Sequence, residues 1–396
     1  MSRRTPALLG LGTVLAAATA CSSAGGAGGA GGSAAGRLSI AAGDTACAVS
    51  TGSLPAGRHT FAVQNTGSDV TEVYVYAAGE RVVGEAENIG PGTGRDLTVD
   101  LPAGSYQVTC KPGMTGSGIR SPLTVTDSVA TAAPAVVPAG PPGPMGAAAV
   151  AAYRSYVGTE ARALVDTTAP FVAAVKAGDA ANARALYPAG RVHYERIEPL
   201  AESFGDLDPL IDERADDVRA GQQFRGFHAL EKALFADKDI SSSGPAADAL
   251  LANCRLLQDR LAAITITPLT MANGAKSLLD EVAASKVTGE EERYSRIDLT
   301  DFAANVEGAR TVYVDLRPLV EAHDPALART VDQRFSALEA LLAQQRVAAG
   351  GRGSVPGTAY VSYDALASAR VKSLATAVDA VGESLGRVGA TVTGSS

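Results

Sequence analysis

Polar and apolar residues alternate in short runs from Arg37 to about Asp127. The clearest runs cover residues 59–65, 71–77, 95–101, 105–110 and 121–126, and they are rich in β-branched and aromatic residues. Turn-forming sequences such as LPAG and GPGTG separate them. Short strands at this spacing predict a small β-sandwich or barrel of Greek-key type over residues 38–127.

The pattern changes to a helical one at about Ala148 and stays helical to the end of the chain. Apolar residues recur at helical spacing in residues 151–179, 250–264, 302–323 and 330–349. A stretch rich in Pro, Ala and Gly, residues 128–147, separates the two patterns and is typical of an extended linker. We therefore predict a multidomain β + α protein whose second part, residues 148–396, is an all-α domain of long antiparallel helices.

The N-terminus has the features of a secretory signal. Residues 1–20 hold a twin-Arg start, a short apolar stretch and small residues before Cys21. The sequence before Cys21 is similar to a bacterial lipobox but lacks its usual Leu, so we expect lipidation of Cys21, with plain signal cleavage as the alternative. Residues 21–37, dominated by Gly, Ala and Ser, would then form a flexible tether.

Composition narrows the classes of function. Hydrophobic residues make up 46% of the 396 residues, which indicates folded domains. The formal net charge is −8 and we find no basic stripe, so the chain is not expected to bind nucleic acid. An acidic body of this kind suits cationic ligands.

The three cysteines outside the signal region have two expected roles, a disulfide and a buried apolar side chain. Cys47 and Cys110 lie near the two ends of the β-region, and a disulfide between them is allowed outside the cytoplasm. Cys254 lies in a strongly helical apolar stretch and is most simply a small buried hydrophobic residue.

Three segments of the helical part concentrate polar residues. The first places Glu195, Glu198 and Glu202 on one helix face. The second contains His228 and Glu231 at i, i+3 spacing. The third holds Glu290, Glu291, Glu292, Asp298 and Asp301. A helix face of carboxylates is unfavourable unless solvent or a cation offsets it, and a mixed imidazole and carboxylate site suits iron, manganese or zinc.

A simpler interpretation exists for each segment. A His-x-x-Glu pair occurs by chance in many helices. Runs of acidic residues are usually solvated, which we take as the default for Glu290 and Glu291. His193 reads as a surface neighbour of Glu195, and His323 as a helix end.

Residues 193–217, 224–235 and 278–320 together resemble the imelysin-like domain of EfeO-type iron-uptake proteins, in order and with similar spacing. In that family a Gly-x-His-x-x-Glu motif is the proposed metal site, and Gly226, His228 and Glu231 match it here. The resemblance implies a double four-helix bundle that binds ferrous or ferric iron. By the face argument we add Glu195, Glu198 and Asp298 as candidate ligands.

Residues 80–110 resemble the cupredoxin-like domain that precedes the helical domain in longer members of the family. His59 is the single histidine of this domain, which argues against a blue-copper centre with two His ligands. The family instead implies a site for copper or iron built from cysteines and acids. The matching residues are Cys47, Glu72, Cys110 and Glu87. Ala48 and Tyr74 replace two acids of the family pattern, and a Cys47–Cys110 disulfide would exclude cysteine ligation.

The resemblance implies an extracytoplasmic, lipid-anchored component of an EfeUOB-like iron-uptake system. Such a component would capture iron and deliver it to a membrane iron permease, together with a haem peroxidase of the same system. It would not be an enzyme.

Two other classes of function remain as alternatives. The first is an imelysin-like metallopeptidase, although the helical part holds only three histidines, at positions 193, 228 and 323, and no His-Glu-x-x-His sequence. The second is a metal-dependent glycan- or partner-binding surface lipoprotein, which the absence of Trp weakens because sugar sites commonly stack on aromatic rings.

Overall fold

We analysed a computed structural model of the chain. It describes residues 38–78, 81–126, 143–201, 203–216, 218, 221–284, 286–348 and 350–393. The expected signal peptide, Cys21, the tether and residues 128–142 of the linker lie outside these residues, as does Glu202. Residues Arg37–Ser396 form one compact unit.

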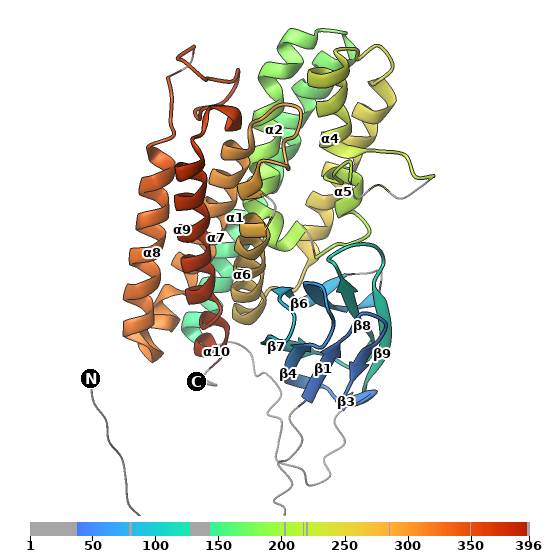
Figure 1. Ribbon diagram of the computed structural model, residues 1–396, viewed down its shortest axis with the longest axis vertical. Coiled ribbons are helices and arrows are strands. Elements are labelled where there is room, and N and C mark those ends of the chain that lie inside the picture. The colour runs from blue at the N-terminus through green and yellow to red at the C-terminus, as the bar shows by residue number, and fades with distance from the viewer. Residues whose placement is uncertain are drawn as a thin grey trace, which may run out of the picture. The chain divides into compact units, whose positions relative to one another are not determined.

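The β-domain consists of two sheets around one core (Figure 1). One sheet has the order β2 (Cys47–Val49), β1 (Leu38–Ala42), β4 (Gly57–Asn65) and β7 (Gly94–Leu101). The other has the order β3 (Ser53–Pro55), β9 (Ile119–Thr126), β8 (Gly104–Pro112), β5 (Thr71–Tyr76) and β6 (Val82–Ile89). β1 pairs with β4, and β3 with β9, in parallel; the other pairs are antiparallel.

Alternation explains the core of this domain. Val73 and Val75 of β5, two residues apart, are both fully buried, and Val99 of β7 is buried to the same degree. The five strands expected from the sequence are present, but β1, β2, β3 and β6 were not predicted individually. Strand β6 was missed because Glu85 and Glu87 interrupt its apolar residues, and β2 and β3 have only three residues each.

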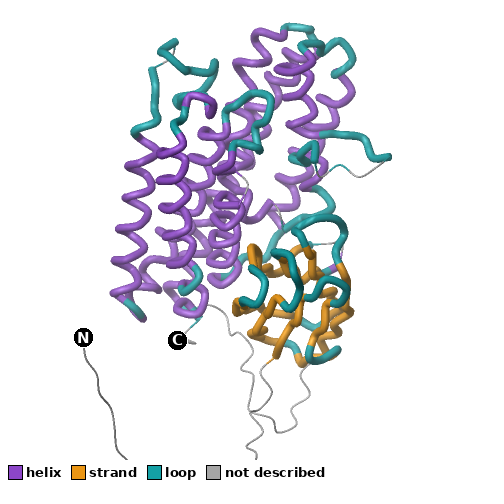
Figure 2. The backbone as a smooth tube through the Cα atoms, viewed as in Figure 1, coloured by secondary structure: helices purple, strands orange, loops and turns teal. Residues whose placement is uncertain are grey.

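The described residues from Pro144 onward are mainly helical (Figure 2). The long helices are α1 (Pro144–Lys176), α2 (Ala180–Ala201), α5 (Gly244–Ala263), α6 (Pro268–Ala284), α7 (Asp298–His323), α8 (Pro325–Ala343) and α9 (Ser368–Leu385). The short ones are α3 (Asp208–Ile211), α4 (Gly226–Glu231), the π-helix η2 (Lys232–Asp237), the 3-10 helices η3 (Lys286–Thr288) and η4 (Tyr363–Ala365), and α10 (Val388–Val392). A β-domain followed by an all-α domain confirms the predicted fold class.

The helices pack in two groups that meet at α2 and α7. Helices α1, α2 and α5 pack together with α3 and α4, whereas α6, α7, α8 and α9 pack with one another. Gly308 allows α7 to approach α2 closely, because a Cβ at this position would lie 2.4 Å from the carbonyl oxygen of Arg196. Among the described residues, no helix is both long and apolar enough to cross a membrane.

Candidate metal centre

Helix α4 begins at Gly226, and this glycine determines where the motif lies. Its φ is +71°, a conformation that favours glycine. A Cβ there would lie 2.2 Å from the carbonyl oxygen of Ile211. The backbone of α4 therefore lies directly against the end of α3, and His228 is brought beside Asp212, the residue after Ile211. His228 and Glu231 share the inner face of α4 as their i, i+3 spacing requires.

His228 is surrounded by four carboxylates. Its Nδ1 lies 3.1 Å from Glu231 Oε2 and 3.8 Å from Glu292 Oε1. Its Nε2 lies 3.5 Å from Asp212 Oδ1 and 3.5 Å from Glu291 Oε1, with no hydrogen-bond partner. Two sets of candidate ligand atoms result, each within 4.8 Å: Asp212, His228 and Glu291, and His228, Glu231 and Glu292.

The turn that carries Glu291 and Glu292 is fixed to α4 by backbone hydrogen bonds. The amides of Tyr294 and Ser295 donate to Glu231 Oε1, at 2.8 and 2.7 Å. The amide of Glu292 donates to Asp298 Oδ1 at 3.1 Å. Asp298 therefore holds the turn that presents Glu292, and it does not belong to either set of candidate ligand atoms.

Glu292 is also oriented by hydroxyl groups. Tyr187 donates its hydroxyl to Glu292 Oε1 at 3.0 Å, and the Ser295 hydroxyl donates to Glu292 Oε2. The side chain is fully buried, so these donors replace the water that a carboxylate would otherwise bind. Glu292 is thus held in place before any metal arrives.

Glu195 and Glu198 lie on α2 and belong to neither of the two sets around His228. The amide nitrogen of Asn305 donates to Glu195 Oε2 at 2.9 Å and also to Glu198. Glu195 in addition pairs with Arg191 on its own helix. The structure brings Glu195 and Glu198 together, but not into the two sets around His228.

Sequence reasoning missed three residues that the structure places beside His228, namely Asp212, Glu291 and Glu292. The interpretation of Glu291 as solvated surface was wrong, because its side chain is only 3% exposed, whereas Glu290 is exposed as expected. His193 lies 2.7 Å from Glu160 Oε2 rather than beside Glu195, and His323 ends α7 as predicted.

The cluster carries far more negative than positive charge. Its buried or nearly buried carboxylates are Glu195, Glu198, Asp212, Glu231, Glu291, Glu292, Asp298 and Asp301. Among the buried residues that the structure describes, the only permanent cation is Arg191. Arg214, whose side chain is 34% exposed, also brings its Nη1 to 3.4 Å from Glu291 Oε2. So many carboxylates cannot all stay ionised away from water beside these two guanidinium groups, so the cluster must bind protons or a further cation.

The pKa values show where protons bind when no metal is present. Burial lowers the pKa of His228, but the hydrogen bond to Glu231 and the nearby carboxylate of Glu291 outweigh it and raise the pKa to about 10. Burial raises the pKa of Glu292, and raises that of Asp298 to about 6. Burial opposes ionisation of Glu231 as well, but its bonds to His228 and to the two backbone amides lower its pKa. Without metal, His228 is an imidazolium at neutral pH, and a metal ion must displace its proton.

Replacing Gly226 by Ala tests the placement of α4. We expect a loss of at least about 2 kcal/mol in the free energy of unfolding, because a Cβ combines a strained φ with a backbone clash. Gly158→Ala in α1 is the matched control, since a Cβ there makes only an ordinary contact with Arg162. Urea unfolding measures both variants. Equal stability of the two would show that α4 tolerates a side chain at its start.

The candidate residues of the β-domain are arranged differently. Cys47 and Cys110 form a disulfide with an S–S distance of 2.03 Å, so neither sulfur is a thiolate ligand. The Tyr74 hydroxyl donates to Glu72 Oε2 at 3.0 Å and to Glu87 Oε1 at 2.8 Å. Tyr74 thus bridges the two acids that the resemblance pairs with the cysteines.

Other partners complete the picture of this domain. Lys111 Nζ lies 3.3 Å from Glu72 Oε1. Burial, together with Glu85 and Glu72, raises the pKa of Glu87. His59 Nε2 lies 2.7 Å from the carbonyl oxygen of Pro55, and Cys254 is a free, buried thiol.

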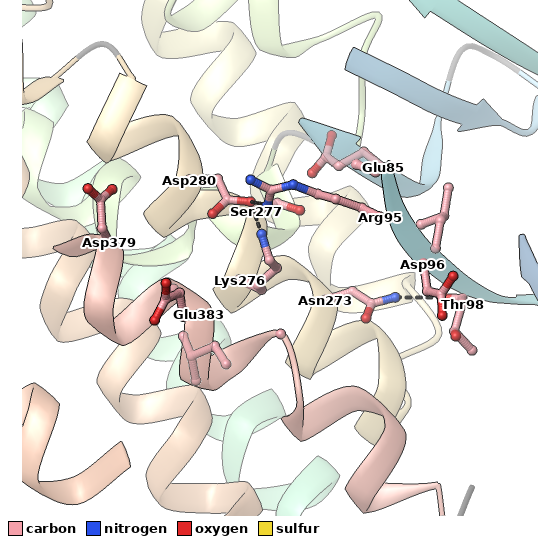
Figure 3. A pocket seen from close by; sticks show the side chains of 15 residues that line it. Glu85, Arg95, Asp96, Thr98, Asn273, Lys276, Ser277, Asp280, Asp379 and Glu383 are labelled. Carbon is pink, nitrogen blue, oxygen red and sulfur yellow. Dashed lines mark hydrogen bonds and ion pairs between the residues drawn. The ribbon is translucent and has the colours of Figure 1, made fainter. Parts of the chain in front are cut away.

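A separate cavity of about 570 Å³ lies where β6 and β7 face α6 and α9 (Figure 3). Its charged side chains are largely occupied with one another: Asp280 binds Lys276, and Arg95 Nη1 lies 3.1 Å from Asp280 Oδ2. Asn273 donates to the carbonyl oxygen of Thr98 at 2.8 Å. None of the residues around His228 lines this cavity. The cavity belongs to a polar interface between the β-domain and the helices.

Comparison with known proteins gives consistent results. The family profile described as Imelysin (Peptidase_M75) matches residues 149–388. The iron uptake system component EfeO of Yersinia pestis is 39% identical over 355 residues, which is 89% of this chain and 90% of that protein. EfeO of Escherichia coli O157:H7 is 37% identical over 348 residues, 87% of this chain and 88% of that one. A solved structure of a putative iron-regulated protein A precursor from Parabacteroides distasonis aligns with 65% of this chain and 98% of its own chain, with 15% identity and a TM-score of 0.49.

Proposed function

Since the chain belongs to the imelysin family and is an EfeO-type member of it, we propose that it is the extracytoplasmic iron-binding component of a multicomponent iron-uptake system. One observation carries the proposal at the level of residues. His228, Glu231 and Glu292 on one side, and Asp212 and Glu291 on the other, converge in a cluster whose negative charge protons or a bound cation must offset.

Iron is the cargo of this site and not a reagent. The donor set of one imidazole and several carboxylates suits hard cations such as ferrous and ferric iron. Glu231 and Glu292 are preoriented by backbone amides and hydroxyls, so little rearrangement is needed when the ion enters. The helical domain would capture iron and hold it until transfer to a membrane permease, in a system that also contains a haem peroxidase.

The proposed location follows from the N-terminal sequence. Lipidation at Cys21 would anchor the chain to the membrane, and residues 21–37 would serve as its tether. The β-domain would not supply cysteine ligands in its disulfide-bonded form. Copper or iron in that domain would have to use Glu72 and Glu87 with other donors.

The geometry gives less support to peptidase activity. A zinc peptidase commonly uses two histidines, or other third ligands, with a Glu positioned as a base. Here His228 is the one histidine in the cluster, because His193 pairs with Glu160. Every acid around His228 is engaged with it, with Arg191 or with backbone amides. Capture of a cation therefore agrees better with this arrangement than turnover of a peptide.

The test is an anaerobic titration of the protein with ferrous iron, with bound metal read by elemental analysis. The His228→Ala/Glu231→Ala variant should lose affinity by more than about 100-fold, because loss of even the outer partners of metal ligands commonly costs about 10–100-fold. The His193→Ala/Glu160→Ala variant is the matched control, since it removes a His–Glu pair outside the cluster.

The outcomes separate the candidate functions. Binding by wild type and by the control, lost in the first variant, supports iron capture at α4. Unchanged binding in the first variant would contradict the site. Hydrolysis of casein that a chelator abolishes would support the peptidase alternative instead.

A further inference from the structure

One arginine lies inside the candidate metal centre. Arg191, on α2, is fully buried and is the largest fully buried side chain among the described residues. Its guanidinium cannot lose its proton, so it is a permanent positive charge. Arg191 Cζ also lies 5.4 Å from the ring centroid of Phe227, the residue between the Gly and the His of the motif. Packing therefore fixes this charge beside His228.

The guanidinium contacts five carboxylates. Two of them, Glu195 and Asp301, belong to the α2–α7 side of the cluster; Nη2 pairs with Glu195, and both Nε and Nη2 lie 3.0 Å from Asp301 Oδ2. The other three are Asp212, Glu291 and Glu292, and these are candidate metal ligands.

Arg191 and His228 approach the same oxygen atoms. Arg191 Nη1 pairs with Asp212 Oδ1, which lies 3.5 Å from His228 Nε2. Arg191 Nε lies 3.0 Å from Glu292 Oε1, which lies 3.8 Å from His228 Nδ1. Glu291 Oε1 is 3.9 Å from Arg191 Nη2 and 3.5 Å from His228 Nε2.

The shared oxygens have an energetic consequence. An ion in either set, with Asp212 and Glu291 or with Glu292 among its ligands, must draw these oxygens from the guanidinium, and it then sits close to a fixed positive charge. Repulsion between the metal ion and the nearby guanidinium is strong in a buried site, because little water is present to screen it. When the ion leaves, the guanidinium is already in place to bind the same oxygens.

We propose that Arg191 is a built-in competitor of the metal ion, which limits the affinity of the site and allows the ion to be released. This inference rests on the proposed function, since it concerns the same site. The guanidinium of Arg191 offsets part of the negative charge when no metal is bound, which keeps the empty site folded. When metal is bound, the same guanidinium competes for the carboxylates, which keeps metal binding reversible. Arg191 acts as a positioning residue and not as a ligand.

The experiment compares Arg191→Gln with Arg191→Lys and wild type. Affinity for ferrous iron, measured anaerobically, and for Zn²⁺ as a redox-inert probe should rise by at least about 10-fold in Arg191→Gln, because the opposing charge is gone. Release to an external chelator should slow by a similar factor. Arg191→Lys retains the charge but loses the forked set of donors, so its affinity should lie between those of wild type and Arg191→Gln. Without metal, Arg191→Gln should unfold at a lower temperature than wild type, and added metal should remove the difference.

Two results would overturn the inference. Equal or weaker metal binding by folded Arg191→Gln would make Arg191 a purely structural residue. If Arg191→Gln does not fold, Asp301→Asn is compared with Arg191→Gln/Asp301→Asn. Both variants lack the carboxylate of Asp301, so less negative charge remains to be offset when Arg191 is replaced. The double variant must then bind metal more tightly than Asp301→Asn. Absence of metal binding in wild type would remove the proposed function itself, and that outcome is distinct from a wild type that binds while Arg191→Gln fails to tighten.

Discussion

Reduction of the Cys47–Cys110 disulfide should lower the free energy of unfolding by about 4 kcal/mol, as estimated from the entropy of loop closure. The bond joins residues 63 positions apart in the sequence. It also connects β2 of one sheet with β8 of the other, within the shared core. Urea unfolding with and without dithiothreitol gives the difference directly.

The Cys47→Ala/Cys110→Ala variant provides the control for this measurement. It should unfold at the same lower urea concentration as the reduced wild type, and dithiothreitol should have no further effect on it, because Cys254 is unpaired. Iron binding at α4 should be unchanged in this variant. An unfolding midpoint that does not respond to reduction would show that the bond does not constrain the chain.

The empty protein should lose stability as pH rises from about 6 to 9. The pKa of His228 is raised to about 10 in the folded state, so its contribution is fully present below its unfolded pKa of about 6.5 and is lost as pH rises toward 10. Asp298, with its pKa raised to about 6, acts in the same direction at lower pH, and the raised pKa of Glu292 acts in the same direction as well. We expect a loss of roughly 3 kcal/mol between pH 6.5 and 9.

Metal binding should show the opposite dependence. Displacement of one proton from His228 predicts an affinity that rises about 10-fold per pH unit, so about 100-fold between pH 6 and 8. Calorimetric titration with Mn²⁺, in two buffers of different ionisation enthalpy, counts the protons released. The His228→Gln variant should lose the part of both slopes that His228 contributes, because Gln does not bind a proton. Metal-free stability that stays flat or rises over this range would contradict the assigned protonation.

The local part of the site could be predicted from sequence, and the distant part could not. His228 and Glu231 lie three residues apart on one helix, so their spacing alone places them on one face. Asp212 and Glu291 come from a helix end and a turn that only tertiary packing brings to α4. Glu291 belongs to a run of acids, and such a run carries no sign that one member points inward.

The burial of Arg191 could not be predicted from sequence either. It precedes Glu195 by four residues, so the sequence does place the two on one helix face. A pair of this kind is most often an exposed ion pair, and here tertiary contacts with Phe227, Asp212 and Asp301 enclose it. For the β-domain, the alternation of polar and apolar residues predicted the strands that build most of the core. It did not predict β6, because Glu85 and Glu87 interrupt the apolar pattern of that strand.

The origin of the candidate ligands has a mechanical consequence. Asp212, His228 and Glu231 follow α2 and precede α5, in the first group of helices, whereas Glu291 and Glu292 lie in the turn between α6 and α7 of the second. An ion held by either set acts as a removable cross-link between the two groups of helices, because each set combines ligands from both groups. Loading therefore couples their local opening motions, and unloading uncouples them. A partner protein could in this way distinguish the full carrier from the empty one by its rigidity, without contacting the ion.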